Sequence, residues 1–97
     1  MVRPKRFRYI KREPNVTYFK PAGVRMIELE EVILNVDEFE ALRLKDVEDL
    51  DQVEAAKKMK ISQPTFNRLL NSARKKVSTA IVEGRAIKVE GGEYKVI

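Results

Sequence analysis

Residues 51–77 read DQVEAAKKMKISQPTFNRLLNSARKKV, and this stretch decides the fold. Asp51, with a glutamate three residues later, forms a capping box, so we expect a short helix to begin there and to run to about Met59. Residues 60–62 are the predicted turn. Ser62 is the expected N-cap of a second helix, whose first turn tolerates a proline because the amides there have no intrahelical partner. The pattern predicts a helix-turn-helix.

The second helix has two contrasting faces. Apolar side chains recur at helical spacing on one face, which we expect to be buried: Phe66, Leu69, Leu70, Ala73, Val77, Ala80 and Ile81. The other face carries amides, hydroxyls and cations, which are the groups that read base edges or bind phosphate. The predicted DNA-binding residues here are Ser62, Gln63, Thr65, Asn67, Arg68, Asn71, Arg74 and Lys75.

Position along this helix separates the two expected roles. Asn67 and Arg68 lie near the N-terminal end that would enter a major groove, so we expect them to read bases. Arg74 and Lys75 lie further along and would contact the phosphate backbone. A polar helix face is in general simply solvated, and it is the conjunction with the short first helix and the capped turn that favours nucleic-acid binding.

Lys60 departs from the usual pattern, because the glycine common at that turn position is absent and a left-handed lysine costs roughly 1 kcal/mol.

Composition narrows the function classes. The chain has 97 residues and 43% apolar content, enough for one small domain with one modest core. It contains neither cysteine nor histidine, so disulfides, thiolate zinc sites and the commonest general base are excluded. We therefore expect no enzyme, metal or cofactor.

No apolar run approaches the ~18 residues that span a bilayer, and no signal-peptide hydrophobic region is present, so we expect a cytoplasmic protein without membrane contact.

Charge is segregated along the chain. Residues 1–25 hold eight cations against one glutamate, residues 26–54 hold two cations against eleven carboxylates, and residues 55–97 hold ten cations against three carboxylates. Such a distribution indicates that one face attracts a polyanion while another repels it. We expect the carboxylates to cap helices or to lie on exposed helix faces.

The N-terminal residues 1–12 form a predicted basic arm ahead of a single domain, residues 13–97. Arms of this kind lie along phosphates or enter a minor groove, so the arm residues Arg3, Lys5, Arg6 and Arg8 are also predicted to bind DNA. Two alternatives stay open. The segment is a solvated tail, or Phe7 and Tyr9 belong to a short strand.

The remaining elements follow from local signals. Residues 13–23 are expected to be a loop that packs its aromatic side chains on the core, and residues 24–36 fit a helix and a strand equally well. A helix over 37–47, opened by Asp37, precedes the helix-turn-helix over 51–83. A β-hairpin is predicted over 86–97 with Gly91-Gly92 as its turn.

Several motifs give the chain a resemblance to known proteins. The segments R-P-K-R (3–6), V-T-Y-F-K-P-A-G (16–23), L-E-E-V-I-L-N-V-D-E-F-E-A-L-R-L (29–44) and A-R-K-K-V (73–77) resemble an uncharacterised family of small prokaryotic predicted DNA-binding proteins. V-D-E-F-E-A-L-R-L and S-Q-P-T-F-N-R-L-L are also similar to region 4 of bacterial sigma factors. The resemblance implies a mainly α fold, a three-helix helix-turn-helix domain of the winged-helix-like superclass, with sequence-specific binding of double-stranded DNA and transcriptional regulation.

Three further hypotheses remain at this point. An RNA-binding module would use scattered aromatic side chains, and an RNA polymerase-interacting or adaptor module of sigma-like shape would use the acidic segment. A homodimer would form through the apolar face of the hairpin, made of Ile87, Val89, Tyr94 and Val96. The competing interpretation of that face is that it covers the protein's own helices or pairs with the segment near Val32–Leu34.

Overall fold

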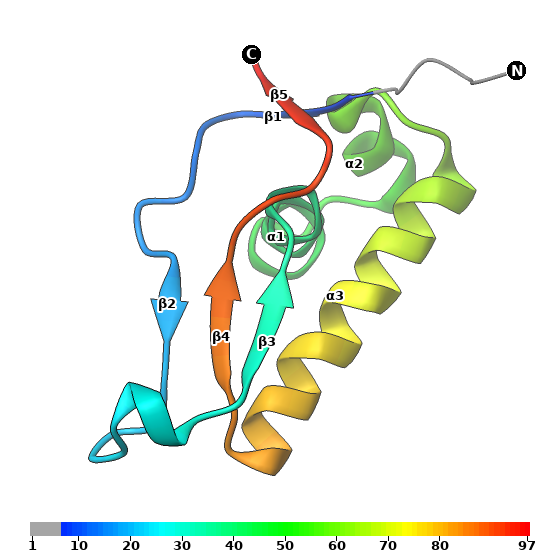
Figure 1. Ribbon diagram of the computed structural model, residues 1–97. Coiled ribbons are helices and arrows are strands. Elements are labelled where there is room, and N and C mark those ends of the chain that lie inside the picture. The colour runs from blue at the N-terminus through cyan, green and yellow to red at the C-terminus, as the bar shows by residue number, and fades with distance from the viewer. Residues whose placement is uncertain (1–6) are drawn as a thin grey trace, which may run out of the picture.

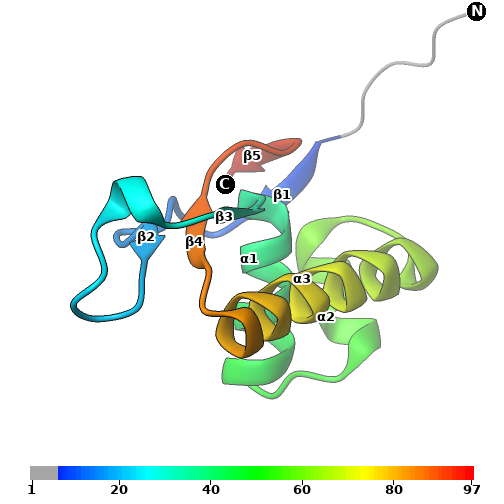
Figure 2. The same ribbon diagram turned by 60° about the horizontal axis from the view of Figure 1, so that its bottom comes forward.

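The computed structural model describes residues 7–97 and shows a small domain of three helices and short strands (Figure 1). The helical elements are η1 (Met26–Glu28), α1 (Val36–Leu42), its continuation η2 (Arg43–Val47), α2 (Gln52–Met59) and α3 (Gln63–Glu83). The strands are β1 (Arg8–Ile10), β2 (Tyr18–Phe19), β3 (Glu31–Leu34), β4 (Ala86–Val89) and β5 (Tyr94–Val96). In the turned view α3 crosses α1, and the strands β2, β3 and β4 lie to one side of this crossing (Figure 2).

The predicted caps set the bounds of α2 and α3. The Asp51 side chain accepts a hydrogen bond from the Glu54 amide, and the Ser62 side chain accepts one from the Thr65 amide. Lys60, at the end of α2, adopts the left-handed conformation with φ 54° and ψ 46°. Gly84 ends α3 in the same conformation, where glycine has no side-chain penalty. The connection between the two helices is therefore a three-residue turn held by a cap at each end.

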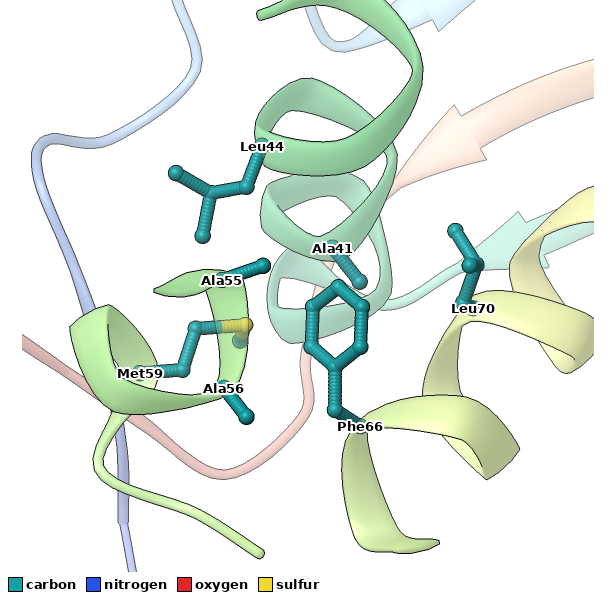
Figure 3. Packing of buried hydrophobic residues seen from close by; sticks show 7 residues of the cluster. All are labelled: Ala41, Leu44, Ala55, Ala56, Met59, Phe66 and Leu70. Atoms are coloured by element: carbon teal, nitrogen blue, oxygen red, sulfur yellow. The ribbon is translucent and has the colours of Figure 1, made fainter. Parts of the chain in front are cut away.

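The first core cluster fills the space between the three helices. Figure 3 shows Phe66 of α3 directed toward Ala41 of α1, with small and flexible side chains around it. The cluster consists of Ala41, Leu44, Ala55, Ala56, Met59, Phe66 and Leu70. Because Ala55 and Ala56 add so little bulk, α2 packs close to its neighbours, and Leu50 and Ile61 close the edge of the cluster. The expected stripe of α3 is correct except at its C-terminal end, where Ile81 is 73% exposed.

The predicted hairpin over 86–97 is wrong, because β4 and β5 belong to different sheets. β4 is the central strand of a three-stranded sheet, antiparallel to β2 and parallel to β3, while β5 pairs in parallel with β1. Gly91 and Gly92 have positive φ, as a turn requires, but the turn lies against the start of α1: the Val36 amide donates to the Gly91 carbonyl. The alternative pairing with Val32–Leu34 is the one observed.

The expectation of a basic arm through residue 12 also requires correction. Strand β1 begins at Arg8, and Ile10 is only 1% exposed in a second core cluster with Leu34, Val36, Ala73 and Val89. A single isoleucine within a run of cations fills this position because pairing with β5 turns its side chain inward. The strand alternative raised by Phe7 and Tyr9 is therefore correct for residues 8–10.

The first helix differs from its prediction at both ends. Its capping box uses Asn35 and Glu38 rather than Asp37, so the helix begins at Val36. After Leu42 the backbone widens into a π-helix, which changes the direction of the later side chains: Leu44 is buried and Val47 is 78% exposed. The preceding ambiguous segment becomes η1 followed by β3.

The segment 13–23 is a strand-containing loop rather than a core-packing one. β2 interrupts it, and the aromatic and aliphatic side chains of Phe19 and Val16 remain about half exposed.

Candidate nucleic-acid interface

One face of α3 is turned away from the core and carries most of the predicted site. Arg68, Asn71 and Lys75 are exposed on it, and Asn67 is half-buried at its side. Gln63 is exposed in the first turn. The structure therefore brings the base-reading and phosphate-binding candidates of α3 together on a continuous solvent-facing surface, because buried positions such as Phe66 and Leu70 point to the opposite side.

A chain of hydroxyl groups orients Arg68 at the start of this face. The Ser62 hydroxyl donates to Thr65 Oγ1 at 3.0 Å, and Arg68 Nη2 donates to the same oxygen at 3.2 Å. The Thr65 amide in turn donates to Ser62 Oγ at 3.3 Å. Ser62 and Thr65 thus cap the helix and hold the guanidinium of Arg68 along its first turns, a geometry that lowers the entropy lost when the guanidinium binds a ligand.

Arg74 is placed differently from the other predicted cations. Its Nε donates to Asp46 Oδ2 at 2.9 Å, and its Nη2 bonds the second oxygen of the same carboxylate. The hydrogen bond with Arg74 lowers the pKa of Asp46, and the same hydrogen bond raises the pKa of Arg74. Any phosphate that approached Arg74 would have to displace a bidentate carboxylate, whereas no ion pair ties down Lys75 among the described residues.

The sequence interpretation did not include three lysines that precede the turn. Lys57, Lys58 and Lys60 are exposed at the end of α2, and none of them has an acidic partner within the described part of the chain. The ammonium of Lys60 lies 5.3 Å from the centre of the Tyr9 ring, which links β1 to the turn. The run KKMK at 57–60 was the available signal, but lysines in the last turn of a helix are also explained by the helix dipole.

The predicted arm residues fall into two groups. Arg8 is partly buried, with its Nη1 lying 3.3 Å from Glu93 and 3.7 Å from Asp37, so it is an internal ion-pair partner rather than part of a free arm. Arg3, Lys5 and Arg6 lie outside the described residues. Phe7 is exposed at the first described position, immediately before the strand.

Three carboxylates of α1 are buried beneath α3. The expectation that carboxylates cap helices or lie on exposed helix faces is met at Glu38, which takes part in the capping box, and is wrong at Glu40, which is buried within the helix. Glu38 Oε1 accepts from the Asn35 amide at 2.9 Å and pairs with Lys76 at 2.7 Å, and its other oxygen accepts from the Ser72 hydroxyl. Glu40 accepts from the Lys11 amide at 2.9 Å and is paired with Arg43.

The third buried carboxylate, Asp37, lies under the Gly91-Gly92 turn. A Cβ at Gly92 would sit 2.5 Å from its Oδ1, so only glycine lets the turn approach this closely. Burial raises the pKa of Asp37, and the nearby Arg8 offsets part of this effect. Every buried side-chain polar atom among residues 7–97 has a hydrogen-bond partner, so these acids serve as connectors between elements.

Other classes of site find little support in the described residues. Between Phe7 and Ile97 no group of three or more acidic, histidine or cysteine side chains is arranged to hold a metal ion. The longest helix, α3, is too polar to cross a bilayer, and none of the other helices of residues 7–97 qualifies.

Comparison with known proteins places the chain in a family. A UPF0251 protein of Caldanaerobacter subterraneus is 58% identical over 96 residues, covering 99% of this chain and 81% of the relative. A UPF0251 protein of Thermoanaerobacter pseudethanolicus is 59% identical with the same coverage, and one from Moorella thermoacetica is 56% identical over 97 residues, 65% of its length. No solved structure matches the chain significantly. The family model described as "Protein of unknown function DUF134" matches residues 1–97, and the chain belongs to this family.

Proposed function

We propose that the chain is a sequence-specific double-stranded DNA-binding protein that regulates transcription. α2, the turn over 60–62 and α3 act as a helix-turn-helix similar to sigma region 4, with α3 entering the major groove. The observation that carries the proposal is the outer face of α3, where Arg68, Asn71 and Lys75 are exposed together on a helix whose start is capped and whose opposite side is anchored in the core.

The chemistry of this face fits duplex recognition. Arg68 offers a planar pair of donors for the O6 and N7 acceptors of guanine, and Asn67 or Asn71 offers the donor and acceptor that adenine requires. Each is one helical turn or less from the next, so all can meet a few successive base pairs. The bases they would read are on the floor of the major groove, which is wide enough to admit an α-helix.

Contacts with the DNA phosphate backbone would come from cations on both sides of the turn. Lys57 and Lys60 are exposed at the end of α2, and the sequence carries further cations before Phe7. Unpaired lysines bind phosphate as point charges and position a protein on DNA without reading its sequence. Paired cations such as Arg8 and Lys76 belong to the scaffold instead.

The decisive experiment is selection of bound duplexes from a random pool by the full chain, followed by affinity measurements on the enriched duplex, a scrambled duplex and the corresponding RNA. We expect the enriched duplex to bind about 10³-fold or more tightly than the scrambled one at physiological salt. Equal affinity for enriched and scrambled duplexes, or preference for the RNA, would overturn the proposal. Capture of RNA polymerase by the chain in the absence of DNA would favour the adaptor alternative.

A further inference from the structure

The middle of α3 carries a run of three cations, Arg74, Lys75 and Lys76. Their surroundings differ, because acids of α1 and of its continuation η2 lie on both flanks of α3. Asp46 of η2 pairs with Arg74 on one flank, and Glu38 of α1 pairs with Lys76 on the other. Within the described part of the chain, only Lys75 of the three can therefore contact a phosphate without breaking an ion pair.

The pair of Arg74 and Asp46 has the geometry that a guanidinium uses for a phosphate. Arg74 Nε donates to Asp46 Oδ2 at 2.9 Å and Arg74 Nη2 donates to the other oxygen, so two hydrogen bonds fill one edge of the guanidinium. Arginine binds phosphate through a two-pronged edge of the same kind. The hydrogen bond with Arg74 also lowers the pKa of Asp46, so this carboxylate is charged at neutral pH. It takes the place that a phosphate would occupy.

The pair lies at the border of the outer face of α3. Position 74 is about 100° around the helix axis from Lys75 and three residues after Asn71, both of which are exposed on that face. The side chain of Arg74 is 47% exposed and that of Asp46 is 38% exposed, so solvent and a competing anion can reach both. If Asp46 released it, Arg74 would add one phosphate contact beside the groove that α3 enters.

We propose that Asp46 keeps Arg74 from contacting DNA, with the carboxylate and the guanidinium still paired in the protein–DNA complex. This inference rests on the proposed function. A phosphate that replaced Asp46 would have to break two charge-assisted hydrogen bonds and would leave an unpaired carboxylate facing the DNA. Because phosphate contacts carry no sequence information, the pair lowers the affinity for every duplex. Base contacts, such as those expected of Arg68, then supply a larger share of the binding.

The first test is a double-mutant cycle of Asp46→Asn and Arg74→Ala, measured as duplex affinity. Asparagine keeps the shape of the aspartate side chain without its charge, so Arg74 is released. We expect Asp46→Asn to bind the enriched and the scrambled duplex about tenfold more tightly at low salt, and Arg74→Ala to cancel this gain. The gain should shrink to about threefold when the salt concentration rises about fourfold, because one added phosphate contact makes the salt slope steeper by about 0.9.

Asp49→Asn is the matched control for the loss of one negative charge. Asp49 is exposed, lies three residues after Asp46, and has no ion-pair partner among residues 7–97. Its φ of 59° is a conformation that asparagine tolerates. The control should change the affinity by less than about twofold. Equal gains in the two variants, a gain that persists alongside Arg74→Ala, or no gain in Asp46→Asn would overturn this inference while leaving the proposed function intact. A chain that binds no duplex DNA would overturn both.

The second test follows the pair directly in the natural chain. The Nε–H group of Arg74 gives a proton–nitrogen NMR signal that is assigned by its loss in Arg74→Ala. On addition of the enriched duplex, we expect this signal to keep its position while the Arg68 signal moves, and we expect both signals to move in Asp46→Asn. If the Arg74 signal of the natural chain moves as far as the Arg68 signal does, phosphate displaces Asp46 and the inference is wrong.

Discussion

The ammonium of Lys76 lies 2.7 Å from the carboxylate of Glu38, an acid that is almost completely buried at the start of α1. This pair and the adjacent hydrogen bond from Ser72 fasten the middle of α3 to α1 on the flank opposite the Arg74–Asp46 pair. α3 is therefore held from both sides. Its outer face keeps a fixed orientation relative to α2 and to the turn.

Replacing Glu38 with alanine should destabilise the domain. The change leaves the Lys76 ammonium and the Asn35 amide without their acceptor; we expect the free energy of unfolding to fall by about 1–3 kcal/mol, less than for a fully buried pair because Lys76 reaches solvent. Urea denaturation measures this. Glu28→Ala, which removes an exposed acid from an i,i+3 pair, is the control and should change the stability by less than about 0.5 kcal/mol. Equal effects of the two changes would contradict the role of Glu38.

Stability should depend on pH through Asp37. Burial raises the pKa of this carboxyl in the folded state, so the folded protein binds the proton more tightly than the unfolded chain does. The contribution of Asp37 to stability is therefore greatest below its unfolded pKa and is lost as the pH rises through the raised folded value. As the pH falls from 7 to about 4, the natural protein should gain stability relative to Asp37→Asn, which cannot titrate. A constant difference between the two urea denaturation curves would contradict this sign.

The left-handed conformation of Lys60 predicts a stabilising glycine. Lys60→Gly and Lys60→Ala both remove the ammonium above Tyr9, so their comparison isolates the backbone effect. We expect the glycine variant to be more stable than the alanine variant by about 1 kcal/mol. Thermal or urea unfolding of the pair measures the difference, and an alanine variant of equal stability would show that the turn relaxes out of the left-handed region.

Mutations on α3 should separate base contacts from phosphate contacts. Arg68→Ala should cost about 1–3 kcal/mol on the preferred duplex and relax selectivity at one base pair. Lys75→Ala should weaken binding to all duplexes alike. Because Asp46 already holds Arg74, we expect Arg74→Ala to reduce DNA affinity less than Lys75→Ala does. Parallel titrations of specific and random duplex measure these effects, and an equal loss on both for Arg68→Ala would remove its base-reading role.

Binding should be strongly salt-dependent. If about six phosphates are neutralised, the logarithm of the binding constant should fall against the logarithm of salt concentration with a slope of about −5. A chain lacking residues 1–6 should show a shallower slope with the same preferred sequence; this deletion ends before β1, so it spares the pairing of Arg8 with β5. A loss of sequence preference at an unchanged slope would instead make those residues base readers.

The local parts of the fold could be predicted, whereas the distant pairings could not. Asp51, Ser62 and Gly84 act on amides and carbonyls within a few residues, so α2 and α3 follow from short-range chemistry. Gly91-Gly92 likewise predicts a turn, but two strands that leave a turn pair with each other only when nothing else competes. Here β4 pairs with β3 and β2, and β5 pairs with β1, which lies more than eighty residues earlier.

In the candidate site too, features set by nearby residues could be predicted and those set by distant residues could not. The facing of Arg68, Asn71 and Lys75 follows from helical periodicity, which was correct along most of α3. Arg74 pairs with Asp46, which lies in the π-helix, and Arg8 pairs with Asp37 and Glu93, which the Gly91-Gly92 turn brings together. Gly91-Gly92 predicts the turn but not where it lies, and the π-helix has no signal in its residues, so those two cations could not be recognised as paired.

The pairing of Arg8–Ile10 with Tyr94–Val96 has a consequence for the order in which the protein is made. Ile10 leaves the ribosome early and remains without its neighbouring strand until the last residues of this domain have been synthesised. The helical cluster around Phe66 can assemble before that moment, since none of its members lies beyond Leu70. Pairing of β1 therefore has to wait until β5 has left the ribosome, and ribosome-bound chains ending before β5 should expose β1 to proteases.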